Sequence, residues 1–439
     1  MMKPLFTLRA KALSFALIAL PCLAQTEPQF PPLNHPVALS DSDYVAPAEE
    51  IAWAKQFRGV SGAGHPVTDD GRGGWISGSS GVRYSGAYTR PEYTPTEFPT
   101  TDLAMDKGLF PPIAPALDVH LRDGVVTLGG DGMYYLTGSS GDNIWAWAQG
   151  IELWRSADLH QWDYLGLVWE IDTEAPDWVK RWRKHPRRAT RAVWAPEIHY
   201  VKGNYYIVYS MCPNGIGIIK SSTGRPDGPY VNAFSYEGPI ADGIDGTLFE
   251  DTDGSVYFTY AGGDYVARLK DDMSGFATPF RKIVIEEYDL DPAHHARSCP
   301  RRAGCKDLAH EGATLFKHDG KYYIGGADSY ENRYSPCIAV SDSIYGPYRM
   351  RHEAVPCGGG TGFFQDRDGN WWCSIFGNDA QAHFREKVGF VKVCFCPSGR
   401  VIPDRDQPFV PKSLRKEWRK KWNNVWKPFT RKTETSDKR

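Results

Sequence analysis

The chain has 439 residues, of which 41% are hydrophobic and 24% are charged, and its formal net charge is -2 at pH 7. This balance is that of a globular protein with a full-sized core, and it excludes a disordered chain and a general binder of polyanions. The 44 Gly, 32 Pro, 15 Trp and 23 Tyr favour many short strands joined by turns, so the sequence predicts an all-β fold.

Residues 1–24, "MMKPLFTLRAKALSFALIALPCLA", have the form of a secretory signal peptide. Basic residues precede an apolar stretch from Ala12 to Leu20, and Ala24 offers a cleavage position. Neither this stretch nor any later one is long and apolar enough to span a membrane. We therefore expect a soluble protein, secreted or periplasmic, in which Cys299 and Cys305 are the best candidates for a disulfide.

Residues 25–112 are rich in Gly, Ser, Pro and Tyr and form an N-terminal extension to the repeats that follow. Five copies of a turn with aromatic or apolar neighbours come next: "GGDGMYYLTGS", "VKGNYYIVYS", "DTDGSVYFTYAG", "KHDGKYYIGGA" and "DRDGNWWCSIFG". Each copy has the chemistry of a tight β-hairpin. The strand after each turn opens with a pair of residues that begins at Tyr134, Tyr205, Val256, Tyr322 and Trp371.

These pairs are separated by 71, 51, 66 and 49 residues, lengths that suit one four-stranded sheet per copy. Five such sheets in series predict a five-bladed β-propeller over residues 113–405. A β-sandwich in which the repeats are accidental explains the series of five hairpins less well.

Residues 406–439 form a basic tail, in which Leu414, Trp418, Trp422 and Trp426 recur every four residues. The pattern predicts a short amphipathic helix that packs its Trp stripe onto the propeller. Contact of the helix with a membrane surface or an anionic glycan is the alternative.

Acidic residues recur where the first strand of each blade would line a central cavity. Glu311 and Asp245 each stand 11 residues before the opening pair of their hairpins, and Asp118 stands 16 before its own. Carboxyl groups that face each other across a cavity are what glycosidic cleavage needs: one donates a proton, and one activates water or attacks. A third carboxylate nearby can tune and orient the acid. The sequence therefore predicts a catalytic set of Asp118, Asp245 and Glu311.

The ordered motifs "WRSADLHQW", "WAPEIHY", "IDGTLFEDTDGSVY" and "HEGATLFKHDGKYY" resemble those of glycoside hydrolase family 43, over residues 110 to 405. The resemblance implies a hydrolase that inverts the anomer of plant or algal oligosaccharides or polysaccharides, like an arabinofuranosidase or xylosidase. It also implies that Asp118 is the general base, Asp245 the carboxylate that tunes the acid, and Glu311 the general acid. In an inverting enzyme the base and acid carboxyls are roughly 6.5 to 9.5 Å apart. We expect no nucleic-acid partner.

Three positions depart from the family pattern. Asp118 is followed by Val119 where the family has Pro, and Asp245 is followed by Gly246, so Asp123 is the alternative base. The last blade of the family brings a histidine to the channel, often beside calcium, but "CGGGTGFFQDRDGNWW" has Gly and Thr there. We therefore expect no metal and no other cofactor.

His310, directly before Glu311, suggests the related family 117, whose anhydro-galactosidases act on agar fragments. On a regular strand, however, the His310 side chain would point away from that of Glu311. Trp145, Trp194 and Glu197 are further candidates for binding substrate, although packing explains each equally well. A propeller that binds glycan without cleaving it, and a retaining fructan-type hydrolase, are the remaining alternatives.

The basic run "WRKHPRRATR" lies on an insert just before the second blade. A charge run of this kind is usually a solvated face. If the insert overhangs the mouth of the cavity, it would favour acidic or sulfated oligosaccharides.

Overall fold

The computed structural model describes residues 33–39, 44–55, 67–69, 74–77, 83–85, 107–117, 119–140, 144–185, 188–286, 308–330, 333–378, 382 and 387–431. The predicted signal peptide, Asp118 and the proposed Cys299–Cys305 pair lie outside these residues, and they stay predictions.

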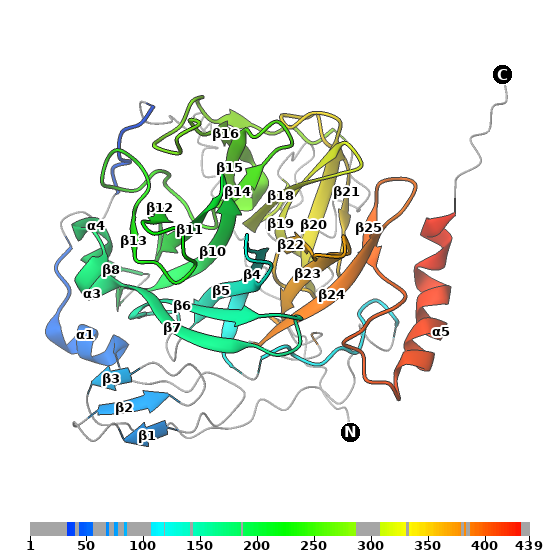
Figure 1. The fold of residues 1–439 in the computed structure, drawn as a ribbon, viewed down its shortest axis with the longest axis horizontal. Coiled ribbons are helices and arrows are strands. Elements are labelled where there is room, and N and C mark those ends of the chain that lie inside the picture. The colour runs from blue at the N-terminus through cyan, green and yellow to red at the C-terminus, as the bar shows by residue number, and fades with distance from the viewer. Residues whose placement is uncertain are drawn as a thin grey trace, which may run out of the picture.

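Five four-stranded antiparallel sheets follow one another along the chain and form the predicted five-bladed propeller (Figure 1). Blade 1 contains β4 (Leu121–Leu128), β5 (Tyr134–Ser140), β6 (Gly150–Ser156) and β7 (Asp163–Glu170). Blade 2 contains β10 (Val193–Val201), β11 (Asn204–Met211), β12 (Ile216–Ser221) and β13 (Tyr230–Asn232). Blade 3 contains β14 (Thr247–Glu250), β15 (Val256–Tyr260), β16 (Tyr265–Arg268) and β17 (Arg281–Lys282). Blade 4 contains β18 (Glu311–His318), β19 (Lys321–Tyr330), β20 (Arg333–Ser341) and β21 (Arg349–Glu353). Blade 5 contains β22 (Gly362–Gln365), β23 (Trp371–Phe376), β24 (Val388–Phe395) and β25 (Val401–Pro403).

The remaining elements are short. A three-stranded sheet contains β1 (Val67–Asp69), β2 (Gly74–Ser77) and β3 (Arg83–Ser85), and a hairpin contains β8 (Arg183–Lys184) and β9 (Ala189–Thr190). The helices are α1 (Ala48–Ala54), α3 (Ile171–Glu174), α4 (Asp177–Lys180), α5 (Arg415–Val425), η1 (Ala261–Gly263) and η3 (Lys427–Thr430). Within the described ranges, no helix has the length and apolar character that crossing a membrane requires.

The blades close into a ring because the first strands of neighbouring blades contact one another. β4 contacts β10, β10 contacts β14, β14 contacts β18, β18 contacts β22, and β22 returns to β4. The segment before blade 1 adds two hydrogen bonds near the interface between blades 5 and 1. The amide of Ala116 donates to the carbonyl of Val388 at 2.8 Å, and the amide of Ala114 donates to the carbonyl of Phe409 at 3.3 Å. The segment that leads into blade 1 is thus hydrogen-bonded to blade 5 and to the segment that follows it.

The repeated turns explain why the five hairpins form. Each has a glycine with positive φ at its tip, where a residue with a Cβ would be strained. These glycines are Gly132, Gly203, Gly254, Gly320 and Gly369, with φ between 72° and 82°.

The helix α5 lies against the outer strands of blade 5, at the right of Figure 1. Trp418, Trp422 and Trp426 are buried there with Ile402. The indole N–H of Trp422 donates to the carbonyl of Pro403 at 2.8 Å, and that of Trp426 donates to Gly108 at 3.0 Å. The predicted Trp stripe is therefore confirmed as a packing surface, whereas Leu414 remains 38% exposed.

A buried histidine links blades 4 and 5. The Nε2 of His352 accepts the amide N–H of Val401 at 2.9 Å, so the proton sits on Nδ1, 2.8 Å from the carbonyl of Met350. Burial lowers the pKa of His352 to about 4. Because the unfolded chain binds this proton near pH 6.5, the group should weaken folding as the pH falls from about 6.5 to about 4.

We predict that His352→Gln flattens this part of the pH dependence, since the lowered pKa corresponds to about 3 kcal/mol of unfolding free energy at most. Urea denaturation of both proteins between pH 7.5 and 4 measures the difference. The exposed His35 offers a control, because His35→Gln should leave the wild-type pH dependence unchanged. Parallel pH profiles for wild type and His352→Gln would contradict the prediction.

Candidate active site

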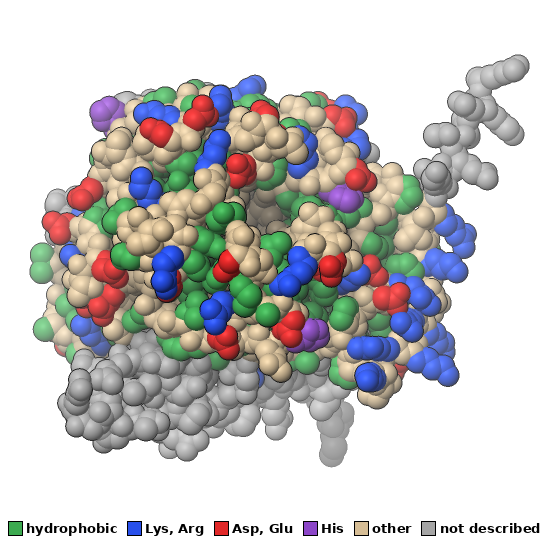
Figure 2. Space-filling model, viewed as in Figure 1, with side chains coloured by type: hydrophobic (Ala, Val, Ile, Leu, Met, Phe, Trp, Pro, Cys, Tyr) green, Lys and Arg blue, Asp and Glu red, His purple; other side chains and the backbone are tan. Residues whose placement is uncertain are grey.

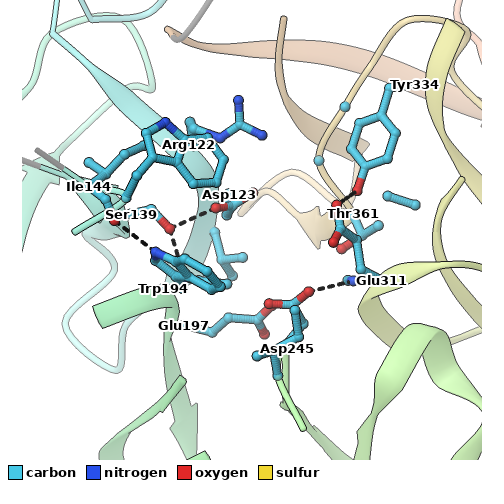
Figure 3. A pocket seen from close by; sticks show the side chains of 18 residues that line it. Arg122, Asp123, Ser139, Ile144, Trp194, Glu197, Asp245, Glu311, Tyr334 and Thr361 are labelled. Carbon is cyan, nitrogen blue, oxygen red and sulfur yellow. Dashed lines mark hydrogen bonds between the residues drawn. The ribbon is translucent and has the colours of Figure 1, made fainter. Parts of the chain in front are cut away.

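A pocket at the centre of the ring receives residues from all five blades (Figure 3). The residue 11 positions before the opening pair of each hairpin lines it: Asp123, Trp194, Asp245, Glu311 and Gly360. The equivalent position of each blade therefore contributes one residue to the pocket. The other lining residues are Arg122, Val125, Ser139, Ile144, Trp145, Ala195, Glu197, Ile244, Gly312, Ala327, Tyr334, Gly359 and Thr361.

Two of the three predicted catalytic residues, Asp245 and Glu311, line the pocket. The third, Asp118, is outside the described residues, so its placement is not given. The alternative base Asp123 lines the pocket, and its spacing of 11 residues is the signal in the sequence that favours it over Asp118.

The strands that line the pocket are irregular at the point where they reach it. The register shifts between Arg122 and Val125 in β4, and there are matching shifts in β10 and β18. Asp123 and Asp245 have positive φ, 52° and 60°, a conformation that Asp tolerates better than most residues. A bulge bends the strand and redirects a side chain, and backbone strain of this kind gathers at functional sites.

The carboxylate of Asp123 is held by its neighbouring strand. Ser139 on β5 donates to Oδ2 of Asp123 at 2.7 Å, and the same hydroxyl accepts the amide N–H of Ala195 at 2.7 Å. One serine therefore fixes Asp123 and joins blade 1 to blade 2.

Asp245 is the most deeply buried of the three aligned carboxylates, with 8% of the residue exposed. Its amide donates to the Ser210 hydroxyl, and its Oδ2 accepts the amide N–H of Gly312, both at 2.7 Å. Burial, followed by the negative charges of Glu311 and Asp123, raises the pKa of Asp245 well above its ordinary value. Asp245 therefore resists ionisation.

Glu311 is anchored through one carboxylate oxygen. The hydroxyl of the buried Tyr334 on β20 donates to Oε1 of Glu311. Burial and the charge of Glu311 raise the pKa of Tyr334 well above its usual value, so this phenol stays a hydrogen-bond donor. The side chain of Glu311 is 34% exposed, which leaves it accessible from the pocket.

His310 does not line the pocket, but its Nε2 lies 3.8 Å from Oε2 of Glu311. The expectation that the two side chains point apart was wrong. It assumed a regular strand, whereas His310 precedes β18 and Gly312 has a φ of 69° at the bulge.

The remaining predicted residues lie on the blade 2 side of the pocket. The indole N–H of Trp194 donates to the carbonyl of Ile144 at 2.7 Å, and its ring meets that of the half-exposed Trp145 edge to face, 5.9 Å away. The buried Glu197 lies 3.1 Å from Nε2 of His199. Trp145, Trp194 and Glu197 all line the pocket, as a substrate-binding role requires.

The basic insert forms only in part the solvated face that its charge run suggested, because Lys184 and Arg188 are exposed whereas two of its arginines are not. Arg183 and Arg191 are buried: Arg183 donates to the carbonyl of Asn214 at 2.6 Å, and Arg191 pairs with Asp172 at 2.6 Å. None of the residues of the run that the structure describes lines the pocket. These arginines hold the insert together because each has a partner that is distant in sequence.

The described residues that blade 5 brings to the pocket do not supply a metal-binding set. Gly359 and Gly360 carry no side-chain ligand, and the hydroxyl of Thr361 donates to the carbonyl of Ala313 at 3.3 Å. No group of three or more His, Cys, Asp or Glu side chains in the described part of the chain is arranged to hold a metal ion. The described residues there therefore do not fit the calcium that the family resemblance suggests, and the expectation about a metal stays a prediction.

We predict that Asp245→Asn stabilises the protein at neutral pH. A carboxyl whose pKa is raised by folding weakens the fold as the pH rises above about 4, and the amide does not titrate. The melting temperature of Asp245→Asn should exceed that of wild type at pH 7.5, and the gain should vanish near pH 4. The exposed Asp368 provides a control, because Asp368→Asn should show no such pH-dependent gain. Destabilisation of Asp245→Asn at every pH would contradict the prediction.

Comparisons with known proteins identify the family of this chain. The model of the family described as "Glycosyl hydrolases family 43" matches residues 114–388. A β-D-galactofuranosidase of Aspergillus niger is 26% identical over 216 residues, which cover 42% of this chain and 56% of that protein. A putative β-xylosidase of Escherichia coli is 26% identical over 240 residues, which cover 51% of this chain and 39% of that protein. The chain thus spans about half the length of these relatives or less.

Among solved structures, the GH43_1 enzyme of Xanthomonas citri complexed with xylotriose has the same fold, with a TM-score of 0.52 and 21% identity. The match covers 69% of this chain and 98% of that one. Because the family model matches more than half of the sequence, the chain is a member of glycosyl hydrolases family 43.

Proposed function

We propose that the protein is an inverting glycoside hydrolase of plant or algal oligosaccharides and polysaccharides, with xylosidase-like or arabinofuranosidase-like specificity. One observation supports the proposal most strongly. Three carboxylates from different blades of a family 43 propeller line one pocket: Asp123, Asp245 and Glu311. The apolar rings of Trp145 and Trp194 give this pocket a wall on which a sugar can stack. Secretion is also proposed, on the basis of the N-terminal segment alone.

Asp123 acts as the general base in this proposal. Its carboxylate takes a proton from a water molecule, whose oxygen attacks the anomeric carbon from the face opposite the leaving group. Ser139 holds Oδ2 of Asp123 and thereby limits the directions in which the carboxylate can face. This orientation contributes to the rate because the reacting atoms start near their positions in the transition state.

Glu311 acts as the general acid and donates its proton to the glycosidic oxygen as the bond to the anomeric carbon breaks. Tyr334 binds Oε1, so Oε2 is the oxygen assigned to proton donation. Asp245 accepts the amide N–H of Gly312, the residue after Glu311, and so positions the backbone that carries the acid. The charge of Glu311 is one cause of the raised pKa of Asp245, so the two carboxyls are electrostatically coupled.

The proposal is tested with 4-nitrophenyl β-D-xylopyranoside, α-L-arabinofuranoside and β-D-galactofuranoside, together with arabinoxylan. Asp123→Asn and Glu311→Gln should each lower kcat/KM on the cleaved substrate by about 10²- to 10⁴-fold, the usual contribution of an acid or base. Asp118→Asn is the matched control and should stay close to wild type. Proton NMR of the first product should show the inverted anomer.

Two results would contradict this scheme. A large loss in Asp118→Asn with none in Asp123→Asn would make Asp118 the base. Net retention of the anomer would exclude the inverting mechanism, because retention proceeds through a covalent intermediate that an inverting enzyme does not form.

We predict that Tyr334→Phe impairs proton donation by Glu311. Loss of a hydrogen bond to a charged group, worth about 1.5–3 kcal/mol, should lower kcat/KM by roughly ten- to a hundredfold on glycosides with poor leaving groups. The loss should be much smaller on 2,4-dinitrophenyl glycosides, whose departure needs no acid.

The buried Tyr348 of the same blade offers a matched control. Its hydroxyl donates to the carbonyl of Ile344 at 2.8 Å, so Tyr348→Phe should leave the leaving-group dependence unchanged. Equal losses of Tyr334→Phe on good and poor leaving groups would show that Tyr334 does not act through the acid.

The short distance between His310 and Glu311 favours one second candidate, an anhydro-galactosidase that acts on agar oligosaccharides. In that case the histidine would contact the substrate or share the acid role. Agar fragments therefore belong in the substrate panel, and cleavage of these alone would favour this candidate.

A further inference from the structure

The outer face of α5 carries a cluster of cations that the proposed reaction does not use. A surface groove is lined there by Arg405, Lys412, Arg415, Lys416, Arg419 and Lys420, together with two asparagines, Asn423 and Asn424. Figure 2 shows Lys and Arg side chains gathered at the right edge of the molecule, where Figure 1 places α5. We call this surface the basic groove.

The basic groove is held in a fixed place by the opposite face of the same helix. Trp418, Trp422 and Trp426 are buried on the side of blade 5, and two of their indoles donate to backbone carbonyls. The cations therefore stand on a rigid support, which lowers the entropy lost when they order around a ligand.

The acidic residues near the basic groove neutralise only part of its charge. Asp406 pairs with Arg419 at 2.7 Å and lies 3.8 Å from Arg405. Lys412, Lys416 and Lys420 are exposed and recur every four residues. Within α5 this interval corresponds to about 6 Å along the helix axis. A row of positive charge thus stands on a protein whose formal net charge is -2.

We propose that the basic groove binds a polyanionic glycan, a polysaccharide chain that carries carboxylate or sulfate groups at regular intervals. The repeated lysines match a ligand with repeated charges better than a single small anion. None of the described residues that line the groove is aromatic or aliphatic. Binding of single-stranded nucleic acid uses stacking on aromatic rings, and insertion into a membrane uses apolar side chains. Asparagine amides can bond the sugar hydroxyls.

This inference rests on the proposed function, because a glycan hydrolase meets polysaccharides as substrates. The basic groove shares no residue with the catalytic pocket, so it would hold the polymer without taking part in bond cleavage. It would raise the local concentration of substrate chains and select acidic polysaccharides over neutral ones.

The test compares binding of the whole protein to polygalacturonate, heparin, neutral arabinoxylan, double-stranded DNA and phosphatidylglycerol vesicles. Wild type should bind polygalacturonate or heparin at about 0.05 M salt and lose this binding at about 0.5 M, because salt screens exposed charges. The triple variant K412Q/K416Q/K420Q should bind roughly tenfold more weakly or worse. The control K184Q/K202Q/K321Q removes three exposed lysines of the propeller and should bind like wild type.

A 4-nitrophenyl glycoside separates this inference from the proposed function. K412Q/K416Q/K420Q should hydrolyse the small substrate at the wild-type rate, and Glu311→Gln should retain polyanion binding. Equal binding of wild type and the triple variant, or no binding to either anionic glycan, would overturn the proposal. Tighter binding of DNA or of vesicles than of both glycans would also overturn it. If the protein binds the anionic glycan but hydrolyses no substrate, the proposed hydrolase function is contradicted and the proposed binding by the basic groove is not.

Discussion

The arrangement of the pocket carboxylates depends on hydrogen bonds that join neighbouring blades. Every one of the five interfaces has such a bond, and most involve a serine or threonine hydroxyl. The bonded pairs are Ser139 with Ala195, Ser210 with Asp245, Asp245 with Gly312, Thr361 with Ala313, and Ser374 with Gly124. Because the carboxylates come from separate sheets, these bonds fix their mutual positions, and small displacements there are costly to a reaction.

Asp245 combines two demands that oppose each other. Its carboxylate bonds the amide of Gly312 and so joins blade 3 to blade 4, yet burial and the charges around it disfavour its ionised form. Natural proteins tolerate such local instability at sites that need it, and the loss is offset by stable structure elsewhere. The buried ion pairs of blade 4, Arg351 with Asp328 and Arg333 with Glu353, lie in the sheet that carries Glu311 and satisfy charged groups in its interior.

The regular spacing of the hairpins was enough to predict the five blades and to align Asp245 with Glu311. The same spacing of 11 residues also identifies Asp123, which lines the pocket, whereas Asp118 lies outside the described residues and stays a prediction. Tyr334 could not be predicted, because it lies on the third strand of its blade and reaches Glu311 only through the packing of that sheet. The burial of Arg183 could not be predicted from the sequence either, because the carbonyl that it bonds belongs to Asn214, 31 residues away.

The way in which the ring is closed has a mechanical consequence. The interface between blades 1 and 5 is the one whose two sides are not consecutive in the chain. Trp426 bonds Gly108, which precedes blade 1, and Trp422 bonds Pro403 at the end of β25, the last strand of blade 5. Helix α5 therefore ties the segment that leads into blade 1 to the outermost strand of blade 5, and a force that pulls these two segments apart must break the contacts of α5.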